Sequence, residues 1–237
     1  WSIIFNSEID NITFEGRYFG RYIENKLKSI KLKNESDAIE ILNKIDKDNF
    51  VVKEKVTTKK RRNPSKPFTT STLQQEASRK LNFSTSKTMS VAQQLYEGIN
   101  IGKEGSVGLI SYMRTDSTRL SETIVNQAID YIKENYGEMY ASKGNTYSKT
   151  SSNAQDAHEA VRCSSIYRSP NSIKEYLTLD QFKLYRMIWE RTVASQMTQS
   201  QFLATRYDFE NNGEIFKASG SIMIFDGYTK IWKTQDN

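Results

Sequence analysis

The chain has 237 residues, of which 37% are hydrophobic and 26% charged, a composition typical of a globular protein with its own core. The longest apolar runs, such as Ile222–Phe225, are far too short to cross a bilayer, which excludes a membrane-spanning helix. The 34 Lys and Arg residues exceed the 28 Asp and Glu residues by 6, which slightly favours a polyanionic partner.

The single cysteine and the first residues indicate where the protein works. Cys163 has no second cysteine for an internal disulfide, and no cluster of Cys and His residues could hold structural zinc. Trp1 opens a strand-like segment rather than a signal peptide, and no initiator Met precedes it. We therefore expect a cytoplasmic location and an excised part of a longer polypeptide.

The first segment, residues 1–63, mixes strand-like and helical patterns. Trp1–Phe5 and Phe50–Thr57 are rich in apolar and β-branched residues, which predicts strands. The basic run Lys59–Arg62 is followed by two of the chain's three prolines. Charge next to proline is typical of an exposed linker, so we expect a domain boundary here.

Helices are predicted where apolar residues recur every three or four positions. Candidate caps precede three of them at Ser36, Ser71 and Thr178, the last two followed by Gln at the third position. Gly98 and Gly137 are expected to end two others. The apolar stripes are Ile39, Leu42 and Ile45; Leu73, Ala77 and Leu81; Met89, Ala92 and Tyr96; Ile124, Ala128 and Ile132; and Phe182, Tyr185 and Trp189.

The middle of the chain has the pattern of a winged helix-turn-helix. Two short helices are followed by the glycine-punctuated loop Gly102–Gly108, and Leu109–Arg114 is expected to form the next strand. The polar stretch Ser142–Ser152 is expected to be a loop. From Ser200 onward the pattern returns to alternating strands, with Asn212-Gly213 as a turn signal.

These patterns predict an α+β fold with two domains. Residues 1–63 and 198–237 are expected to form one discontinuous β-rich domain. Residues 64–197 are expected to form a mostly helical, winged-helix-like domain inserted into it.

The segment Gly108–Thr118 holds the residues that point to chemistry. If it is extended, Tyr112, Arg114 and Asp116 lie on one face. A guanidinium beside a tyrosine suits phosphoryl transfer, because it binds the phosphate and stabilises the charge that develops on its oxygens. On spacing alone, however, an exposed Tyr–Arg pair in an ordinary sheet is the better interpretation.

His158, the only histidine, lies four residues before Arg162. On a helix the two would share a face and could grip a phosphate, with His158 able to donate a hydrogen bond or a proton near neutral pH. The other interpretation is local packing of His158 and an ion pair between Arg162 and Glu159. For a lone His–Arg pair, spacing alone favours this second interpretation.

Several stretches resemble motifs of the type IA DNA topoisomerase family, and they occur in the family's order. The resemblance covers essentially the whole chain and favours topoisomerase I over topoisomerase III. The matching stretches are Pro67–Ser78, which resembles the entry to the cleavage domain; Ala92–Gly98, its next helix; Ser111–Ser117, the active-site motif; Ala157–Arg162, a further motif; and Phe225–Tyr228, later in the arch.

The resemblance implies a role for each matching residue. Tyr112 would be the nucleophile that forms a 5′-phosphotyrosine, and Arg114 would contact the scissile region of the DNA. The further nucleotide- or DNA-binding candidates are His158, Arg162, Glu97 and Asp116. Cys163 stands where the family usually has Pro, a departure expected to alter a helix exit rather than the chemistry.

The resemblance also implies the activity of the intact enzyme. It would cut one DNA strand in a single-stranded part of an underwound duplex, pass another strand and reseal the first without ATP. Negatively supercoiled DNA would thereby be relaxed. The β-rich domain would form part of an arch over a toroidal hole.

The family's metal site, an acidic Asp-x-Asp cluster in a Toprim domain, has no clear counterpart here. The only Asp-x-Asp is Asp46-Lys47-Asp48, which follows a helix-like stretch and is interpreted as solvated surface. Mg²⁺ would therefore be bound by a domain absent from this chain. No metal is expected in the fragment, which would be inactive without the remaining domains of the same polypeptide.

Three other classes compete with this interpretation. A non-enzymatic winged-helix module that binds nucleic acid would suit the helices and the basic run, but it leaves the order of the motifs unexplained. A tyrosine recombinase needs a larger Arg/His cluster before its tyrosine, whereas His158 follows Tyr112. A structural interaction domain would account for none of the motifs.

Overall fold

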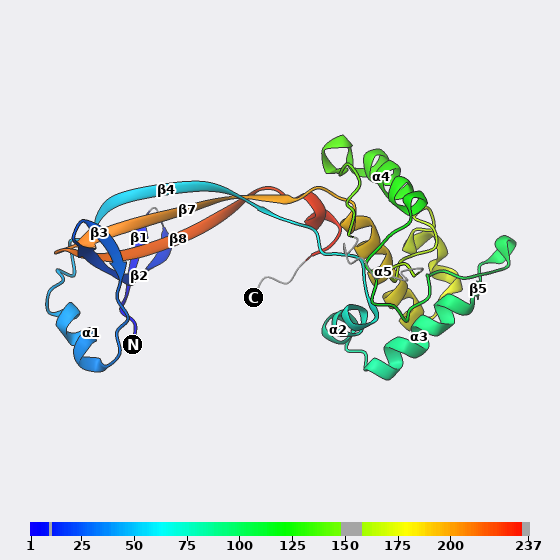
Figure 1. Cartoon of the computed structure of the whole chain (residues 1–237), viewed down its shortest axis with the longest axis horizontal. Helices are drawn as coiled ribbons and strands as arrows, with labels where there is room; N and C mark the ends of the chain where they lie inside the picture. The colour runs from blue at the N-terminus through cyan, green and yellow to red at the C-terminus, as the bar shows by residue number, and fades with distance from the viewer. Residues whose placement is uncertain (10, 148–157, 234–237) are drawn as a thin grey trace. The chain divides into compact units, whose positions relative to one another are not determined.

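The computed structural model describes residues 1–9, 11–147 and 158–233. The chain divides into two compact units, which are coloured along the sequence in Figure 1. The β-rich unit comprises Trp1–Arg61 and Gln201–Phe225, and the helical unit comprises Arg62–Ser200 and the residues from Asp226 onward. Both helices and antiparallel strands are present, so the predicted α+β class is confirmed.

A six-stranded sheet forms the β-rich unit, in the order β1-β2-β8-β7-β4, with β3 also paired to β2. The β7–β8 hairpin closes at Asn212-Gly213, where both residues have the positive φ of a two-residue hairpin turn, as predicted. Its elements are β1 (Ile4–Ile9), β2 (Ile12–Ile23), β3 (Lys26–Ser29), α1 (Glu35–Leu42), β4 (Val51–Arg62), β7 (Ser200–Asn211) and β8 (Glu214–Phe225).

The basic run Lys59–Arg62 lies inside β4, so it is a strand rather than the predicted linker, although it is exposed and the boundary between the units falls at Arg61 and Arg62. β4 is the last strand in the sheet order, next to β7. Lysine and arginine are well tolerated on an edge strand, because their charges oppose pairing with another chain. The run therefore continues the strand up to the unit boundary.

The cap of helix α1 lies two residues before the cap predicted at Ser36. Asn34 caps it instead, because its side-chain oxygen accepts a hydrogen bond of 2.8 Å from the Asp37 backbone N–H. The helix buries Ala38 and Ile41, whereas Ile39 and Leu42 of the predicted stripe are exposed. Beneath it, the Phe5 ring packs within 4.2–6.1 Å of four other Phe rings, which form the centre of this core.

The described residues of the helical unit form four α-helices, with short 3-10 turns and a two-stranded hairpin. Ala77, Ala92 and Ala128 are completely buried, as their stripes predict. These α-helices and strands are α2 (Thr70–Leu81), α3 (Thr85–Glu97), β5 (Ile99–Asn100), β6 (Ser106–Val107), α4 (Glu122–Tyr136) and α5 (Leu179–Ser195); the 3-10 turns are Gly102–Glu104, Glu138–Tyr140, Pro170–Tyr176 and Gly227–Lys230.

Most predicted ends of these helices are confirmed. Thr178 and Gln181 form the capping box of α5, and Gly98 and Gly137 follow α3 and α4 at positive φ. The exception is α2, where Thr69 and Thr72 form the capping box in place of Ser71. A hydroxyl two positions earlier thus starts the helix.

Residues 226–233 belong to the helical unit, although the sequence assigned them to the β-rich domain. Tyr228 and Trp232 are buried in the helical core. The Arg191 guanidinium lies 4.3 Å from the Trp232 ring centre, and Lys80 Nζ lies 3.5 Å from it. These contacts hold residues 226–233 in the helical unit, although the strand pattern of the preceding residues continues the β-rich domain. The last four residues lie outside the described part of the chain.

Within the described residues, no helix combines the length and the apolar character that crossing a membrane requires. Of the predicted polar loop at 142–152, only residues 142–147 are described, and they form no helix or strand.

Candidate active site

Tyr112, Arg114 and Asp116 are all exposed, while Met113 and Ser117 between and beyond them are buried. This alternation follows the predicted shared face. The segment is nevertheless not a strand, as was predicted for Leu109–Arg114. Among the described residues, its isolated bridge joins Ile110 to Cys163, so the neighbouring segment pairs with it at one position rather than along a ladder.

Backbone contacts fix the segment on its N-terminal side. The Leu109 N–H donates to the Leu95 carbonyl at 2.7 Å, so the start of the segment lies against the last turn of α3. Gly108 passes so close to α3 that a Cβ atom there would lie 2.8 Å from the Tyr96 carbonyl oxygen. Ser111 then joins the segment to residues 160–162: its Oγ donates to the Ala160 carbonyl at 2.6 Å.

Thr70, the first residue of α2, holds the segment on both sides of Arg114. Its Oγ1 donates to the Met113 carbonyl at 2.7 Å and accepts from the Thr115 N–H at 2.8 Å. The Thr70 backbone N–H also donates to the Thr115 carbonyl at 2.9 Å. We call this set of hydrogen bonds the Thr70 clamp. It restricts the backbone on both sides of Arg114, which lies two residues after Tyr112.

Three rings form a row at the exposed surface of the site. Tyr112 is 40% exposed, and Tyr96 on α3 meets it edge-on with 5.3 Å between ring centres. The His158 ring lies beside the same tyrosine, tilted by 41°, with 6.4 Å between the ring centres. The structure therefore brings the His158 ring beside Tyr112, a contact that the sequence analysis did not predict. Tyr96 was predicted only as part of a helix stripe, and its place beside Tyr112 was missed.

Arg162 forms the ion pair with Glu159 that the second interpretation of its sequence position described. Its Nε donates to a Glu159 oxygen at 2.9 Å, and its Nη1 donates to the Cys163 carbonyl at 3.0 Å. The predicted helix over Ala157–Arg162 was wrong for the described residues 158–162, and Ala157 lies outside them. Bridges from Val161 to Phe68 and from Cys163 to Ile110 hold this segment extended.

The other candidates lie at the surface. Glu97, the last residue of α3, is exposed and accepts a hydrogen bond from Gln93 four residues earlier. Asp116 is exposed beyond the Thr70 clamp. Cys163 is completely buried, and burial raises the pKa of its thiol to about 12, so it is a structural residue rather than a nucleophile. Since the described residues just before it, 158–162, form no helix, the expected change in a helix exit does not arise.

The described residues offer no group of three or more His, Cys, Asp or Glu side chains that could hold a metal ion. Asp46 and Asp48 are both exposed, and the Asp48 N–H donates to Asp46 Oδ1 at 3.1 Å. That contact occupies one carboxylate oxygen in a local turn. The described residues therefore do not fit a magnesium site.

Comparison with known proteins places this geometry in a family. Residues 1–237 match the family model described as DNA topoisomerase. The chain is also similar to the structure of full-length topoisomerase I from Thermotoga maritima, with 38% identity and a TM-score of 0.72. That match covers 98% of this chain and 36% of the Thermotoga chain, so our chain spans about a third of that protein's length. The chain belongs to the type IA DNA topoisomerase family.

Proposed function

We propose that the chain carries the nucleophile with which a type IA topoisomerase transiently cleaves one DNA strand. The observation that carries this proposal is the exposed phenol of Tyr112 on a segment that hydrogen bonds hold at both ends. A nucleophile must be both reachable by DNA and held in place, because a small displacement of the attacking atom lowers the rate steeply.

In the proposed reaction, Tyr112 Oη loses its proton and attacks the phosphorus of a phosphodiester. A bond forms between Oη and phosphorus while the bond from phosphorus to the 3′ oxygen breaks, and that oxygen takes up a proton. The 5′ phosphate remains on the tyrosine. Religation reverses each step, and no ATP is consumed because one phosphodiester replaces another.

Arg114 and His158 would assist on either side of Tyr112. Arg114 shares the exposed face with Tyr112, so its guanidinium can bind the phosphate oxygens on which charge develops. His158 lies beside the Tyr112 ring and can donate a hydrogen bond or a proton to the same group. Arg162, Glu97 and Asp116 would act at most on the flanking DNA.

The whole enzyme would act on single-stranded parts of underwound duplex DNA and relax negative supercoils in the cytoplasm. Other domains of the same polypeptide would be needed for strand passage. Magnesium would bind among those domains, since the described residues offer no suitable ligand group.

The competing proposal is a winged-helix module that binds DNA without cutting it, which the α2–α3 pair followed by the β5–β6 hairpin favours. End-labelled DNA separates the two. With the full-length enzyme, a 3′-labelled strand should become attached to protein, whereas a 5′-labelled strand should be released with a free 3′ hydroxyl. Attachment of the 5′-labelled fragment instead would contradict the proposed polarity, and no attachment of either would favour the binding module.

A further inference from the structure

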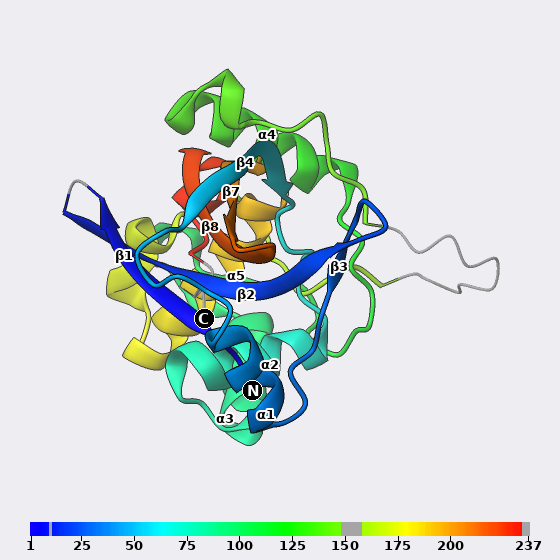
Figure 2. The same ribbon diagram turned by 90° about the vertical axis from the view of Figure 1, so that its left-hand side faces the viewer.

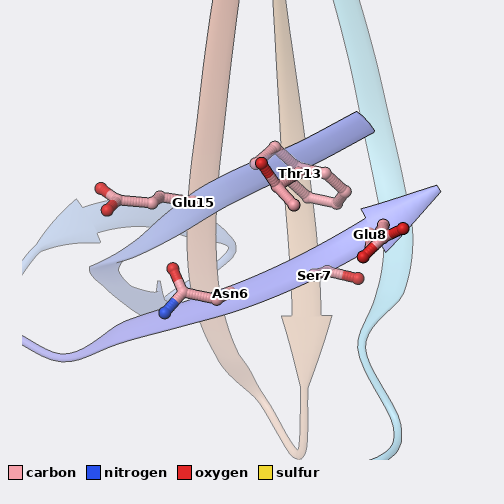
Figure 3. A pocket seen from close by; sticks show the side chains of 6 residues that line it. Asn6, Ser7, Glu8, Thr13 and Glu15 are labelled. Atoms are coloured by element: carbon pink, nitrogen blue, oxygen red, sulfur yellow. The ribbon is translucent and has the colours of Figure 1, made fainter. Parts of the chain in front are cut away.

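The β-rich unit contains a cavity of about 760 Å³ where β2 and β8 part. The two strands pair from Arg17 to Arg21 of β2, whereas the earlier residues of β2 pair with β1. The β1–β2 hairpin therefore turns away and crosses the other strands, as Figures 2 and 3 show. The cavity lies in this fork, and its volume is within the range of about 300–1,000 Å³ typical of ligand sites.

Aromatic rings form one wall of the cavity. Phe14 from β2 and Tyr207 and Phe209 from β7 line it. The Phe14 and Phe209 rings are stacked, with 5.8 Å between centres and 19° between planes, and Tyr207 is tilted by 34° to Phe209. Phe14 and Tyr207 are only half-buried, whereas Phe209 belongs to the core. The wall thus offers the partly open rings of Phe14 and Tyr207 to a flat ligand.

Cationic residues line the cavity or lie beside one of its rings. Arg17 and Lys217 line the cavity, and Lys55 Nζ lies 5.5 Å from the centre of the Tyr207 ring. Arg17 also pairs with Glu15 at 3.3 Å and Lys217 with Asp208 at 3.8 Å, so part of this charge is neutralised within the protein. Binding of a polyanion at this cavity would therefore need further cationic side chains nearby.

The neighbouring strand β4 supplies those cations. It carries six Lys and Arg residues against one Glu. The hydroxyls of Thr57 and Thr205 meet at 3.2 Å, which places these two residues side by side on one face. Because side chains alternate along a strand, Lys55 and Lys59 share that face with Tyr207. A row of positive charge therefore runs from the cavity along the sheet.

We propose that this cavity holds an unpaired base of single-stranded DNA, with the phosphates following Lys55 and Lys59 on β4. Stacking on an aromatic ring requires a free base face, which a duplex does not offer, and cations beside the ring neutralise the backbone. A peptide would match the apolar wall but not the row of lysines. The choice of DNA rests on the proposed function, whereas the site lies outside the unit that carries Tyr112.

Photocrosslinking tests the site on the unmodified chain. A short single strand that carries 5-iododeoxyuridine, irradiated with the 237-residue protein, should give a crosslinked peptide that contains Tyr207 or Phe14. Crosslinks confined to residues 62–200 and 226–233 would overturn the proposal. Because no substitution is involved, a folding defect cannot produce either result.

Two matched pairs of variants test the chemistry by fluorescence anisotropy with labelled oligothymidine. Tyr207→Leu should lower affinity roughly 5- to 150-fold, the loss of one base stack, whereas Tyr207→Phe keeps the ring and should bind like the parent. Lys55→Gln should reduce the salt dependence of binding by about 0.7 in slope, and Lys47→Gln, at an exposed lysine in the turn before β4, should not.

Unchanged affinity in Tyr207→Leu would overturn the inference, as would equal salt slopes for Lys55→Gln and the parent. Loss of the proposed base-binding site can be distinguished from loss of the proposed cleavage at Tyr112. The binding assays require no reaction, and the covalent adduct at Tyr112 can be measured separately in the full-length Tyr207→Leu enzyme.

Discussion

Replacing Thr70 by valine should loosen the segment that carries Tyr112 without changing its volume much. The hydroxyl donates to Met113 and accepts from the Thr115 N–H, so its removal leaves both backbone groups without this partner. An unsatisfied buried group costs about 1–3 kcal/mol, and Thr70 is only partly buried. We therefore expect about 1–2 kcal/mol less stability in the helical unit, a fall in Tm of roughly 2–8 °C.

The effect on cleavage should exceed the effect on DNA affinity, because the clamp fixes the backbone beside Arg114 rather than binding the strand itself. Thr70→Ser should restore most of both losses, since it keeps the hydroxyl. Thr58→Val, an exposed threonine on β4, is the matched control and should change neither. Thermal unfolding and single-turnover adduct formation in the full-length enzyme measure the two effects. Stability and cleavage equal to the parent in Thr70→Val would refute this reasoning.

Three further predictions concern the fragment and its core. The 237-residue chain alone should not relax supercoiled plasmid with or without magnesium, and relaxation on a gel would reveal a metal site among its residues. Trp232→Ala should destabilise the helical unit by about 3–5 kcal/mol in urea unfolding, whereas a cost near zero would remove residues 226–233 from that core. Burial raises the pKa of Cys163 to about 12, so the thiol ionises at lower pH in the unfolded chain than in the folded one. The free energy of unfolding should therefore fall as pH rises from about 9 to 12, and it should fall more steeply than in Cys163→Ala.

Periodicity predicted the elements whose stability comes from one buried stripe. Ile124, Ala128 and Ile132 alone identify α4, and Thr178 with Gln181 identifies the start of α5, because both signals are local in the chain. Tertiary contacts decided the rest. The segments around Ile110 and Val161 look like a strand and a helix in isolation, yet single bridges hold both as irregular extended chain.

In the candidate site, too, local sequence predicted some features, whereas tertiary contacts determined the others. The motif around Tyr112 could be recognised from sequence because its residues are adjacent. The role of Thr70 could not, because its partner Thr115 lies 45 residues away and a threonine at a helix start has an ordinary capping explanation. Likewise, nothing in the spacing of Tyr96 distinguishes a core residue from one that meets Tyr112 at the surface.

The most direct test of the account is the covalent adduct formed by Tyr112→Phe in the full-length enzyme. The two side chains differ by one oxygen, so the ring can still meet Tyr96 and most DNA affinity should remain. Tyr167→Phe, the same change at another exposed tyrosine of the helical unit, is the control and should form the adduct normally. Labelled DNA on a denaturing gel should show no protein-linked strand for Tyr112→Phe. A normal adduct from that variant would contradict the account, because another residue would then be the nucleophile.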